Sequence, residues 1–566
     1  MSTIRRVYFY AVSIITLGIF AAGLQTLIQL LLDTISGSSR VRIETSGYAV
    51  EQLSLGLAML IIGGTLWLLF WRIIGRQVAD NVVETGSTIR KLYLNLIILA
   101  AGVVSLYRAV EFLNWLMAGA PGENFASEAL AILIVTVIIW IYHWRISEAE
   151  GHPTPAARTL RRWYIYILSS WGLVGMTVAL VQFLTNTILH LPFWGESISG
   201  GFWNSGLRDN ISWVIIGGSA WAFHWFRMSG QDPDSTLRQV YLYLLTILGG
   251  AVAGLAALTT TLYTIIRLAF GSLEISTSLH FHPLSWTVPT MLVAAAVWTY
   301  HQQVVSEEEA EMTGAGASPR RVLWYLMSVI GLGTVIAGLI LLFGLILELL
   351  TNAFGGTGLI AASPGWWRQQ LGLVLALLIV GIPLWIYFWK KVLELVASGG
   401  VKEWRARSRR TYLYVIIGVA IITLAADLVN IVYQLLNGIL QGEMGIGVFR
   451  GLRWSLQTLV VAAPVLFYHW RVLRQDQGPA EEKLTAPKAV TILAGAAGLE
   501  LASRIEEKLG SRADRLRFLG EAGQDLPAMS DEDIDKLVSE IQSAPSDKVL
   551  LVATDGKITV LPYQEE

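Results

Sequence analysis

The chain has 566 residues, of which 54% are hydrophobic and 15% are charged, and its formal net charge is −1. Soluble globular chains have about 25% charged residues, so this composition argues against an ordinary water-soluble fold and predicts a multi-pass membrane protein. Cysteine is absent, which excludes disulfides, thiolate metal sites, iron–sulfur clusters and cysteine nucleophiles.

The first apolar run extends from Val7 to Leu32 and follows Arg5 and Arg6. It is longer than the apolar region of a secretory signal peptide, about 7–15 residues, so we expect a retained transmembrane helix. Further runs, each close to the length that crosses a bilayer, are expected at 53–71, 92–116, 129–144, 163–189, 211–226, 240–268, 286–301, 322–350, 371–389, 411–437 and 454–470.

A short opening precedes every second run. Its pattern is Arg-x-x-Tyr-x-Tyr or close to it, and it begins near residues 5, 90, 161, 238, 320 and 409. Each opening leads into an apolar run, a polar loop, a second run and an ending rich in Trp, Tyr, His and Arg, such as WIYHWR at 140–145. The repeat predicts an all-α membrane domain over residues 1–474, with six two-helix units, about 12 transmembrane helices and all units parallel.

Lysine and arginine are distributed unequally about the predicted spans. The side that holds the openings and endings carries 23 basic residues up to Arg474, and the opposite side carries eight. The positive-inside rule therefore predicts that both termini are cytoplasmic, in the cell inner (plasma) membrane. The aromatic and basic helix ends fit the bilayer interface, where their side chains contact lipid headgroups.

Four endings carry a histidine in the same column of the repeat: His143, His224, His301 and His469. Neutral imidazole can bind a metal or haem iron and can relay protons. The alternative is an interfacial histidine that hydrogen-bonds headgroups, water or a neighbouring helix end. Phe70 and Phe388 fill this column in two other units, which excludes a cofactor site shared by every unit. A site that uses only some of these histidines stays open, and we expect no metal, no cofactor and no catalytic residue.

Ionisable and polar residues also lie within the predicted spans. Arg108 and Asp427 each follow the first tyrosine of their opening by fifteen residues, and Glu111 and Asn430 follow it by eighteen. Residues three apart share a helix face and can pair. We predict an intramembrane polar cluster of Arg108, Glu111, Asp427 and Asn430, in which Arg108 faces Asp427 or Glu111. It is either a substrate or ion site or a set of polar contacts that hold helices together.

The composition changes at Arg474, where a polar linker is expected over 475–487. From 488 to 566 the patterns predict a small cytoplasmic α/β domain, with strands at 489–495 and 515–520, helices at 499–510 and 530–544, and a hairpin of 548–554 with 557–563. From residue 476 onward we count 18 acidic and 10 basic residues, a balance of −8. This charge argues against nucleic-acid binding and allows a basic protein partner.

The ordered openings, such as RRVYFY (5–10) and RRWYIY (161–166), and the endings YHWR (142–145 and 468–471) carry a resemblance. Over about residues 1–475 the chain is similar to a bacterial integral membrane family, domain of unknown function 5671. The resemblance implies a multi-helix membrane domain. It supplies no activity, cofactor or catalytic residue.

Three classes of function are consistent with these features. We favour a non-enzymatic membrane scaffold or sensory and regulatory protein, whose partners are the lipid bilayer and a protein bound by the C-terminal domain. The alternative is a transporter or channel with a polar site in the outer half of the helix bundle. The third is a membrane enzyme or haem-bearing redox protein, although the sequence holds no HExxH, GxSxG or kinase motif.

Overall fold

The computed structural model describes residues 3–36, 47–120, 126–194, 201–231, 235–270, 276–311, 317–353, 365–404, 406–442, 445–481, 489–494, 498–509, 513–517, 530–544, 546, 548–554 and 557–563. The chain divides into two compact units. The first comprises Met1–Leu395 and Thr423–Val461, and the second comprises Val396–Ile422 and Ala462–Glu566.

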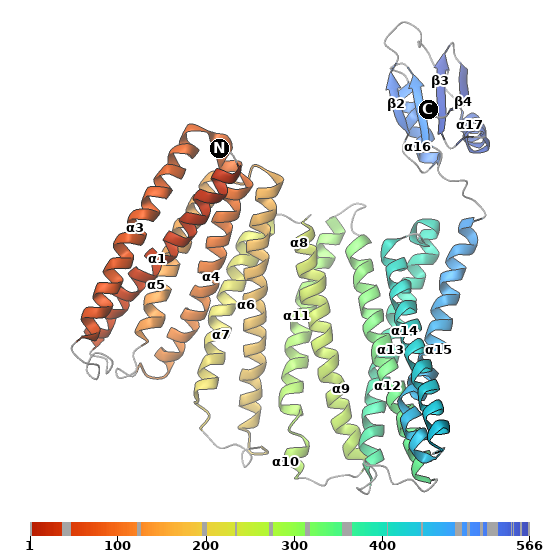
Figure 1. Ribbon diagram of the computed structural model, residues 1–566, viewed down its shortest axis with the longest axis horizontal. Coiled ribbons are helices and arrows are strands. Elements are labelled where there is room, and N and C mark those ends of the chain that lie inside the picture. Colours follow the sequence, from red (N-terminus) through yellow and green to blue (C-terminus); the bar gives the residue numbers. More distant parts are fainter. Residues whose placement is uncertain are drawn as a thin grey trace. The chain divides into compact units, whose positions relative to one another are not determined.

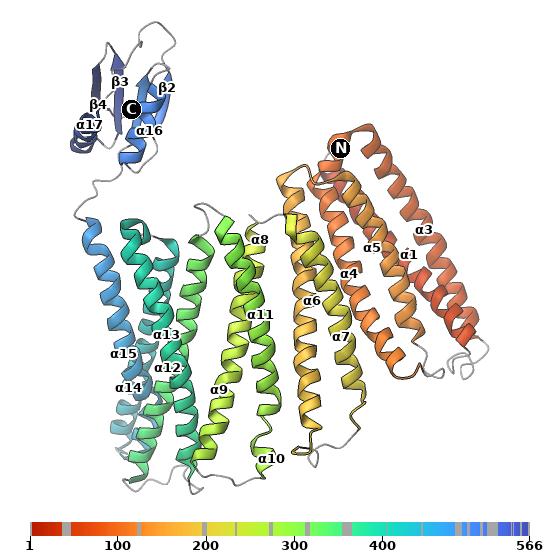
Figure 2. The ribbon, with the colours of Figure 1, turned by 180° about the vertical axis from the view of Figure 1, so that it is seen from behind.

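Long helices form the first compact unit, and three of them include residues of the second (Figures 1 and 2). In chain order the long helices and short turns are α1 (Thr3–Ser36), α3 (Tyr48–Asp80), η1 (Val82–Gly86), α4 (Thr88–Met117), α5 (Ser127–Glu150), α6 (Pro155–Leu189), α7 (Ser205–Ala222), η4 (Phe223–Met228), η5 (Ser229–Gln231), α8 (Thr236–Gln239), η6 (Val240–Leu248), α9 (Gly249–Ala269), α10 (Thr277–His280), α11 (Leu284–Glu311), α12 (Ala317–Ala353), α13 (Trp366–Trp404), α14 (Arg407–Gln441) and α15 (Ile446–Glu481). Helices α1 and α3, α4 and α5, α6 and α7, and α9 and α11 pack as hairpins.

Glycines allow some of these hairpins to pack closely. A Cβ atom added to Gly172 of α6 would lie 2.7 Å from the carbonyl oxygen of Gly217 in α7. A Cβ atom added to Gly331 of α12 would lie 2.6 Å from the backbone nitrogen of Trp385 in α13. Such distances leave no room for a side chain, and small residues at these points are typical of membrane helix interfaces.

Ten helices of the described chain are long and apolar enough to cross a membrane: α1, α3, α4, α5, α6, the continuous segment Thr236–Ala269, α12, α13, α14 and α15. The expected number was about 12. Helices α7 and α11 occupy the remaining two places but are too polar to qualify by composition. Arg208, Asp209 and Asn210 lie in the first turns of α7, and the apolar stretch of α11 is interrupted by Pro289, Thr290 and His301.

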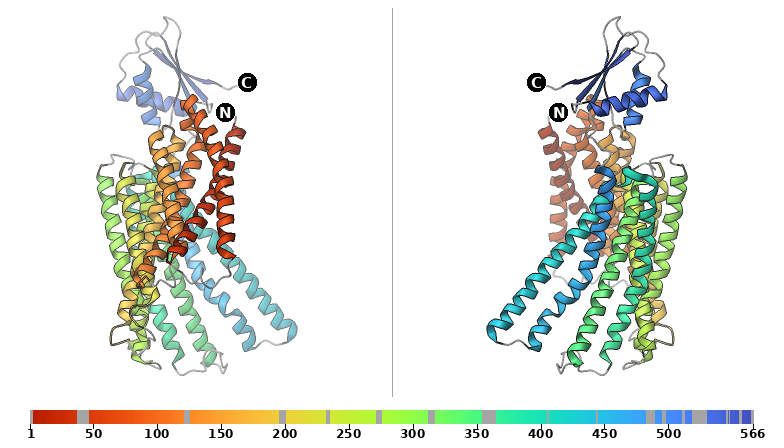
Figure 3. Two further views of the ribbon diagram at one scale, coloured as in Figure 1. Left: turned by 90° about the vertical axis from the view of Figure 1, so that its left-hand side faces the viewer. Right: turned by 90° about the vertical axis from the view of Figure 1, so that its right-hand side faces the viewer.

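The C-terminal part of the second unit is a two-layer α/β domain. Its sheet has the order β2-β1-β3-β4 and comprises β1 (Ala489–Ala494), β2 (Asp514–Arg517), β3 (Lys548–Thr554) and β4 (Lys557–Tyr563). Strand β1 is parallel to β2 and β3, and β4 is antiparallel to β3. Helices α16 (Gly498–Leu509) and α17 (Asp531–Ser543) lie on one face of the sheet (Figure 3).

The core of this domain follows the alternation of the strands. Val490 and Ile492 of β1 point to the same face as Val549 and Leu551 of β3, where they contact both helices. Ser530 caps α17 and accepts a hydrogen bond from the Asp533 nitrogen at 3.3 Å. The segment predicted as a linker begins as helix, since α15 continues to Glu481, and residues 482–488 lie outside the described chain.

Candidate functional site

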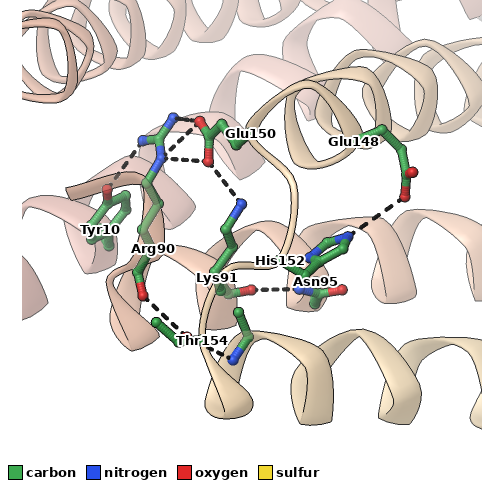
Figure 4. A network of polar contacts seen from close by, with 10 residues as sticks. Tyr10, Arg90, Lys91, Asn95, Glu148, Glu150, His152 and Thr154 are labelled. Carbon is green, nitrogen blue, oxygen red and sulfur yellow. Dashed lines mark hydrogen bonds and ion pairs between the residues drawn. The ribbon is translucent and has the colours of Figure 1, made fainter. Parts of the chain in front are cut away.

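Arg90, in the first turn of α4, forms a buried ion pair with Glu150, the last residue of α5 (Figure 4). Nε of Arg90 lies 2.9 and 3.0 Å from the two carboxylate oxygens, and Nζ of Lys91 donates to Oε2 at 3.0 Å. Nη1 of Arg90 donates to the hydroxyl oxygen of Tyr10 in α1 at 3.1 Å. These charge-assisted bonds hold the ends of three helices together.

The same pair recurs twice. Arg238 donates to Oε1 of Glu308 from Nε at 2.9 Å and from Nη2 at 2.5 Å. Arg409 donates to the Asp476 carboxylate from Nε at 2.6 Å and from Nη2 at 2.9 Å. Each arginine is the first residue of an opening, and each acid follows the histidine of its unit by seven residues (143 and 150, 301 and 308, 469 and 476). We call these three contacts the Arg–acid pairs.

The Arg–acid pairs belong to the second, fourth and sixth units. The other three units have Gln77, Gln231 and Leu395 at the position of the acid. Those units instead carry a glycine seven residues before the histidine column, namely Gly63, Gly217 and Gly381. An added Cβ atom at each of these glycines would lie within 3.0 Å of the backbone of the partner helix. The six repeat units of the sequence therefore alternate between two kinds. Each pair of successive repeat units makes one module, which gives three modules: residues 5–150, 161–308 and 320–476.

Aromatic contacts join the two units within a module. Nε1 of Trp71 donates to the hydroxyl oxygen of Tyr142 at 2.6 Å, and Nε1 of Trp225 donates to that of Tyr300 at 2.8 Å. The arginine of the Arg–acid pair lies over the same tryptophan ring, with its guanidinium carbon 5.6 and 4.6 Å from the ring centroid. The first two modules thus repeat both contacts at equivalent positions.

The histidine column faces the tyrosine column of the openings. His143, His224 and His301 place Nε2 at 3.4, 3.0 and 3.5 Å from the hydroxyl oxygens of Tyr93, Tyr164 and Tyr241. The rings of His469 and Tyr412 are 5.9 Å apart. Nδ1 of every one of these histidines lies 2.8 or 2.9 Å from the carbonyl oxygen four residues earlier.

These histidines are buried, with at most 5% of each residue exposed. Three of them, His143, His224 and His301, contact a tyrosine of the neighbouring helix, which was one of the contacts expected for an interfacial histidine. A carbonyl oxygen only accepts, so Nδ1 carries the proton and Nε2 of a neutral ring is left to accept from tyrosine. Within the described residues, no three His, Asp or Glu side chains converge as a metal site would require.

The four residues of the predicted intramembrane cluster lie on two helices, Arg108 and Glu111 on α4, and Asp427 and Asn430 on α14. Nη1 of Arg108 donates to Glu111 at 2.7 Å, and its Nη2 lies 3.7 Å from Glu128 of α5. Oδ2 of Asp427 accepts from the Thr458 hydroxyl at 2.7 Å. Asn430, three residues further along α14, donates to the Ser455 hydroxyl at 2.9 Å. Each pair contacts residues of its own hairpin, and a contact between Arg108 and Asp427 stays a prediction.

The acids of the Arg–acid pairs were not among the residues predicted from the sequence. Glu150, Glu308 and Asp476 lie just beyond the apolar runs, in segments that normally face water. Their fixed distance of seven residues from the histidine column was the available signal, since two helical turns return to the same face.

Repeated helical hairpins and ten candidate membrane helices define a multi-pass membrane protein with internal repeats. The family described as a domain of unknown function (DUF5671) matches residues 6–128, 115–193, 189–300 and 321–446, more than half of the chain. The chain belongs to this family. The first and last matched segments begin at Arg6 and Arg321, which hold the same place in the openings of the first and third modules. Comparison with curated proteins and with solved structures gave no match.

Proposed function

We propose that this protein is a membrane scaffold whose helical modules support a protein-binding α/β domain. The observation that carries the proposal is the uneven cover of the C-terminal sheet. Helices α16 and α17 cover one face through side chains such as Ile505 and Ile541, which are fully buried. The core cluster of the described domain lies on that face and includes no side chain of the opposite face.

The uncovered face has an apolar centre. Leu516 of β2 pairs with Leu493 of β1, and Leu550 of β3 pairs with Leu561 of β4, so these four side chains share one face. Leu516 and Leu561 are 55% and 44% exposed. An apolar sheet face in an acidic domain supports binding to a protein surface that is apolar at its centre and basic at its rim.

The repeated polar groups support an architectural role for the helical part. The Arg–acid pairs and the three Tyr–His hydrogen bonds satisfy donors and acceptors of the repeated motifs within the chain itself. Interhelical polar contacts of this kind stabilise membrane helix packing by about 0.6–2 kcal/mol each. The repeated openings and endings, the most regular feature of the sequence, thus hold helix ends together in this proposal.

We further infer that α7 and α11 also span the membrane, which gives twelve spans. Each packs along a helix that qualifies by itself, α7 on α6 and α11 on Thr236–Ala269. The excess of basic residues on the motif-bearing helix ends supports cytoplasmic termini and a plasma-membrane location.

The test of the scaffold uses a photo-crosslinking amino acid in the full chain in its native membrane. It replaces Leu561 on the uncovered face or Glu540, which is exposed on α17. We expect a discrete protein adduct from position 561, with a basic protein identified in it, and none from position 540. The substitution Leu561→Glu should prevent binding of that protein, as measured by its co-purification. Equal adducts at both positions, or none at position 561, would contradict the proposal.

A further inference from the structure

A basic pocket of about 320 Å³ lies beside the start of α6. Its lining includes Arg158, Arg161 and Arg162 from α6, His152 from the preceding turn, and Ser229 from η5. Glu148 of α5 approaches two of these groups: one of its carboxylate oxygens lies 3.0 Å from Nη2 of Arg161 and 3.7 Å from Nε2 of His152. Three guanidinium groups thus gather at this pocket, and one of them, that of Arg161, is paired with Glu148.

Polar atoms of the pocket have unused hydrogen-bonding capacity. Nε of Arg161 and both ring nitrogens of His152 are shielded from solvent and have no hydrogen-bond partner among the described residues. The distance of 3.7 Å between His152 and Glu148 is too long for a hydrogen bond. Buried polar groups are normally paired, so these atoms indicate room for an acceptor-rich ligand.

An apolar cavity of about 830 Å³ lies next to the basic pocket, and Tyr166 lines both. Along α6 it is lined by Trp163, Ile167, Trp171 and Val174, spaced at three or four residues and therefore on one helix face. Trp163 and Trp171 are 51% and 41% exposed.

A second apolar cavity of about 440 Å³ shares Val174, Val178, Gln182 and Leu245 with the first. It extends between α6, α9 and α11. A basic pocket and two apolar cavities thus lie next to one another along α6, a candidate membrane-spanning helix.

We propose that this surface binds one anionic diacyl phospholipid, with its phosphate group between Arg158, Arg161 and Arg162 and its acyl chains in the two apolar cavities. Arginine binds phosphate oxygens through paired N–H donors, and basic pockets between membrane helices bind anionic headgroups. The apolar cavities favour a lipid over a free phosphate ion, which would use the basic pocket alone.

The first experiment is native mass spectrometry of the full chain from mild detergent, after incubation with equimolar phosphatidylglycerol and phosphatidylcholine. We expect one retained phosphatidylglycerol and little phosphatidylcholine. The variant R158Q/R162Q should lower the retention ratio roughly 30-fold, at about fivefold for each basic side chain near an anionic lipid. The matched control is R76Q, since Arg76 is exposed at the motif-bearing end of α3 and lies outside the pocket.

A second set of measurements distinguishes a bound phospholipid from a bound free phosphate ion. The substitution Val178→Trp fills the space common to both apolar cavities and should lower phosphatidylglycerol retention. Val429→Trp, at a 70% exposed position of α14, should not. Millimolar inorganic phosphate should not displace the lipid. Equal retention of the two lipids by the unmodified chain, full displacement by phosphate, or identical retention by R158Q/R162Q and R76Q would overturn the proposal.

Discussion

Tyr164 donates its hydroxyl hydrogen to Nε2 of His224 at 3.0 Å, across the hairpin of α6 and η4. The imidazole is fixed at its other side, where Nδ1 donates to the Ala220 carbonyl oxygen at 2.8 Å. Both residues are buried, at 2% and 5% exposure. The Tyr164 hydroxyl thus gives Nε2 of His224 a hydrogen-bond donor, and Nε2 gives this buried hydroxyl an acceptor.

The first prediction concerns this hydrogen bond. Tyr164→Phe removes the donor and should lower the free energy of unfolding by about 0.6–2 kcal/mol, because Nε2 of His224 loses its partner. The matched control is Tyr8→Phe, since Tyr8 holds the same place in the first opening, where the histidine column has Phe70. Tyr8 is also 57% exposed. Equilibrium unfolding in detergent micelles measures both, and equal losses would contradict the assigned role.

The second prediction concerns the Arg–acid pair of Arg238 and Glu308. Glu308→Gln leaves the Arg238 guanidinium buried without its counter-charge, which should cost about 3–5 kcal/mol. The exposed pair of Lys391 and Glu394, at 3.4 Å, provides the control, and Glu394→Gln should cost less than about 1 kcal/mol.

A double-mutant cycle completes this test. Arg238→Gln combined with Glu308→Gln removes both charges and should cost less than the sum of the two single substitutions. Additive losses would show that the two side chains do not stabilise each other.

The sequence predicts the helices well because their signal is local. Apolar runs and repeated openings place Tyr164 and His224 at the same end of one hairpin, and their contact follows from that arrangement. Glu150 was not predicted as the partner of Arg90 because it lies beyond the apolar run, where charged residues are ordinarily solvated. Its burial depends on the packing of α1, α4 and α5, which a single sequence does not specify.

The grouping of units was also hidden. All six openings look alike, so they predict six equal units. The difference lies in two positions of each repeat unit that are fourteen residues apart, occupied by Gly217 and Gln231 in the third unit and by Ala294 and Glu308 in the fourth. Each of these differences between repeat units, taken alone, has no evident structural consequence in the sequence. Only the contacts of the acids show that alternate units have distinct roles.

The third prediction is a pH dependence. Arg6 donates to Glu84 of η1 from Nε at 3.0 Å and from Nη2 at 2.5 Å. These hydrogen bonds lower the pKa of the Glu84 carboxyl below its ordinary value. The stabilisation is therefore complete above the pKa of the unfolded state, about 4.3, and is lost as pH falls through the folded pKa.

Glu84→Gln tests this dependence. Above about pH 5.5 the Tm of the variant should lie below that of the unmodified chain by a constant amount, because Glu84 is ionised in both states. The gap should shrink as pH falls below about 4.3, where the Glu84 carboxyl of the unfolded chain takes up a proton. A gap that does not change with pH would mean that Glu84 stabilises the fold through its shape rather than its charge.

The last prediction concerns the path of α7, and the absence of cysteine makes it direct. A single cysteine can be placed at Ser205 or Gly230, both exposed, at the start of α7 and just after η4. If α7 spans the bilayer, a membrane-impermeant maleimide should label the two positions from opposite sides. Thr159→Cys and Leu191→Cys, at the two ends of α6, provide the reference sides. Gly230 should label with Thr159, and Ser205 with Leu191, because α6 and α7 form one hairpin. Labelling of Ser205 and Gly230 from the same side would reduce the number of spans and reverse the orientation of every unit that follows.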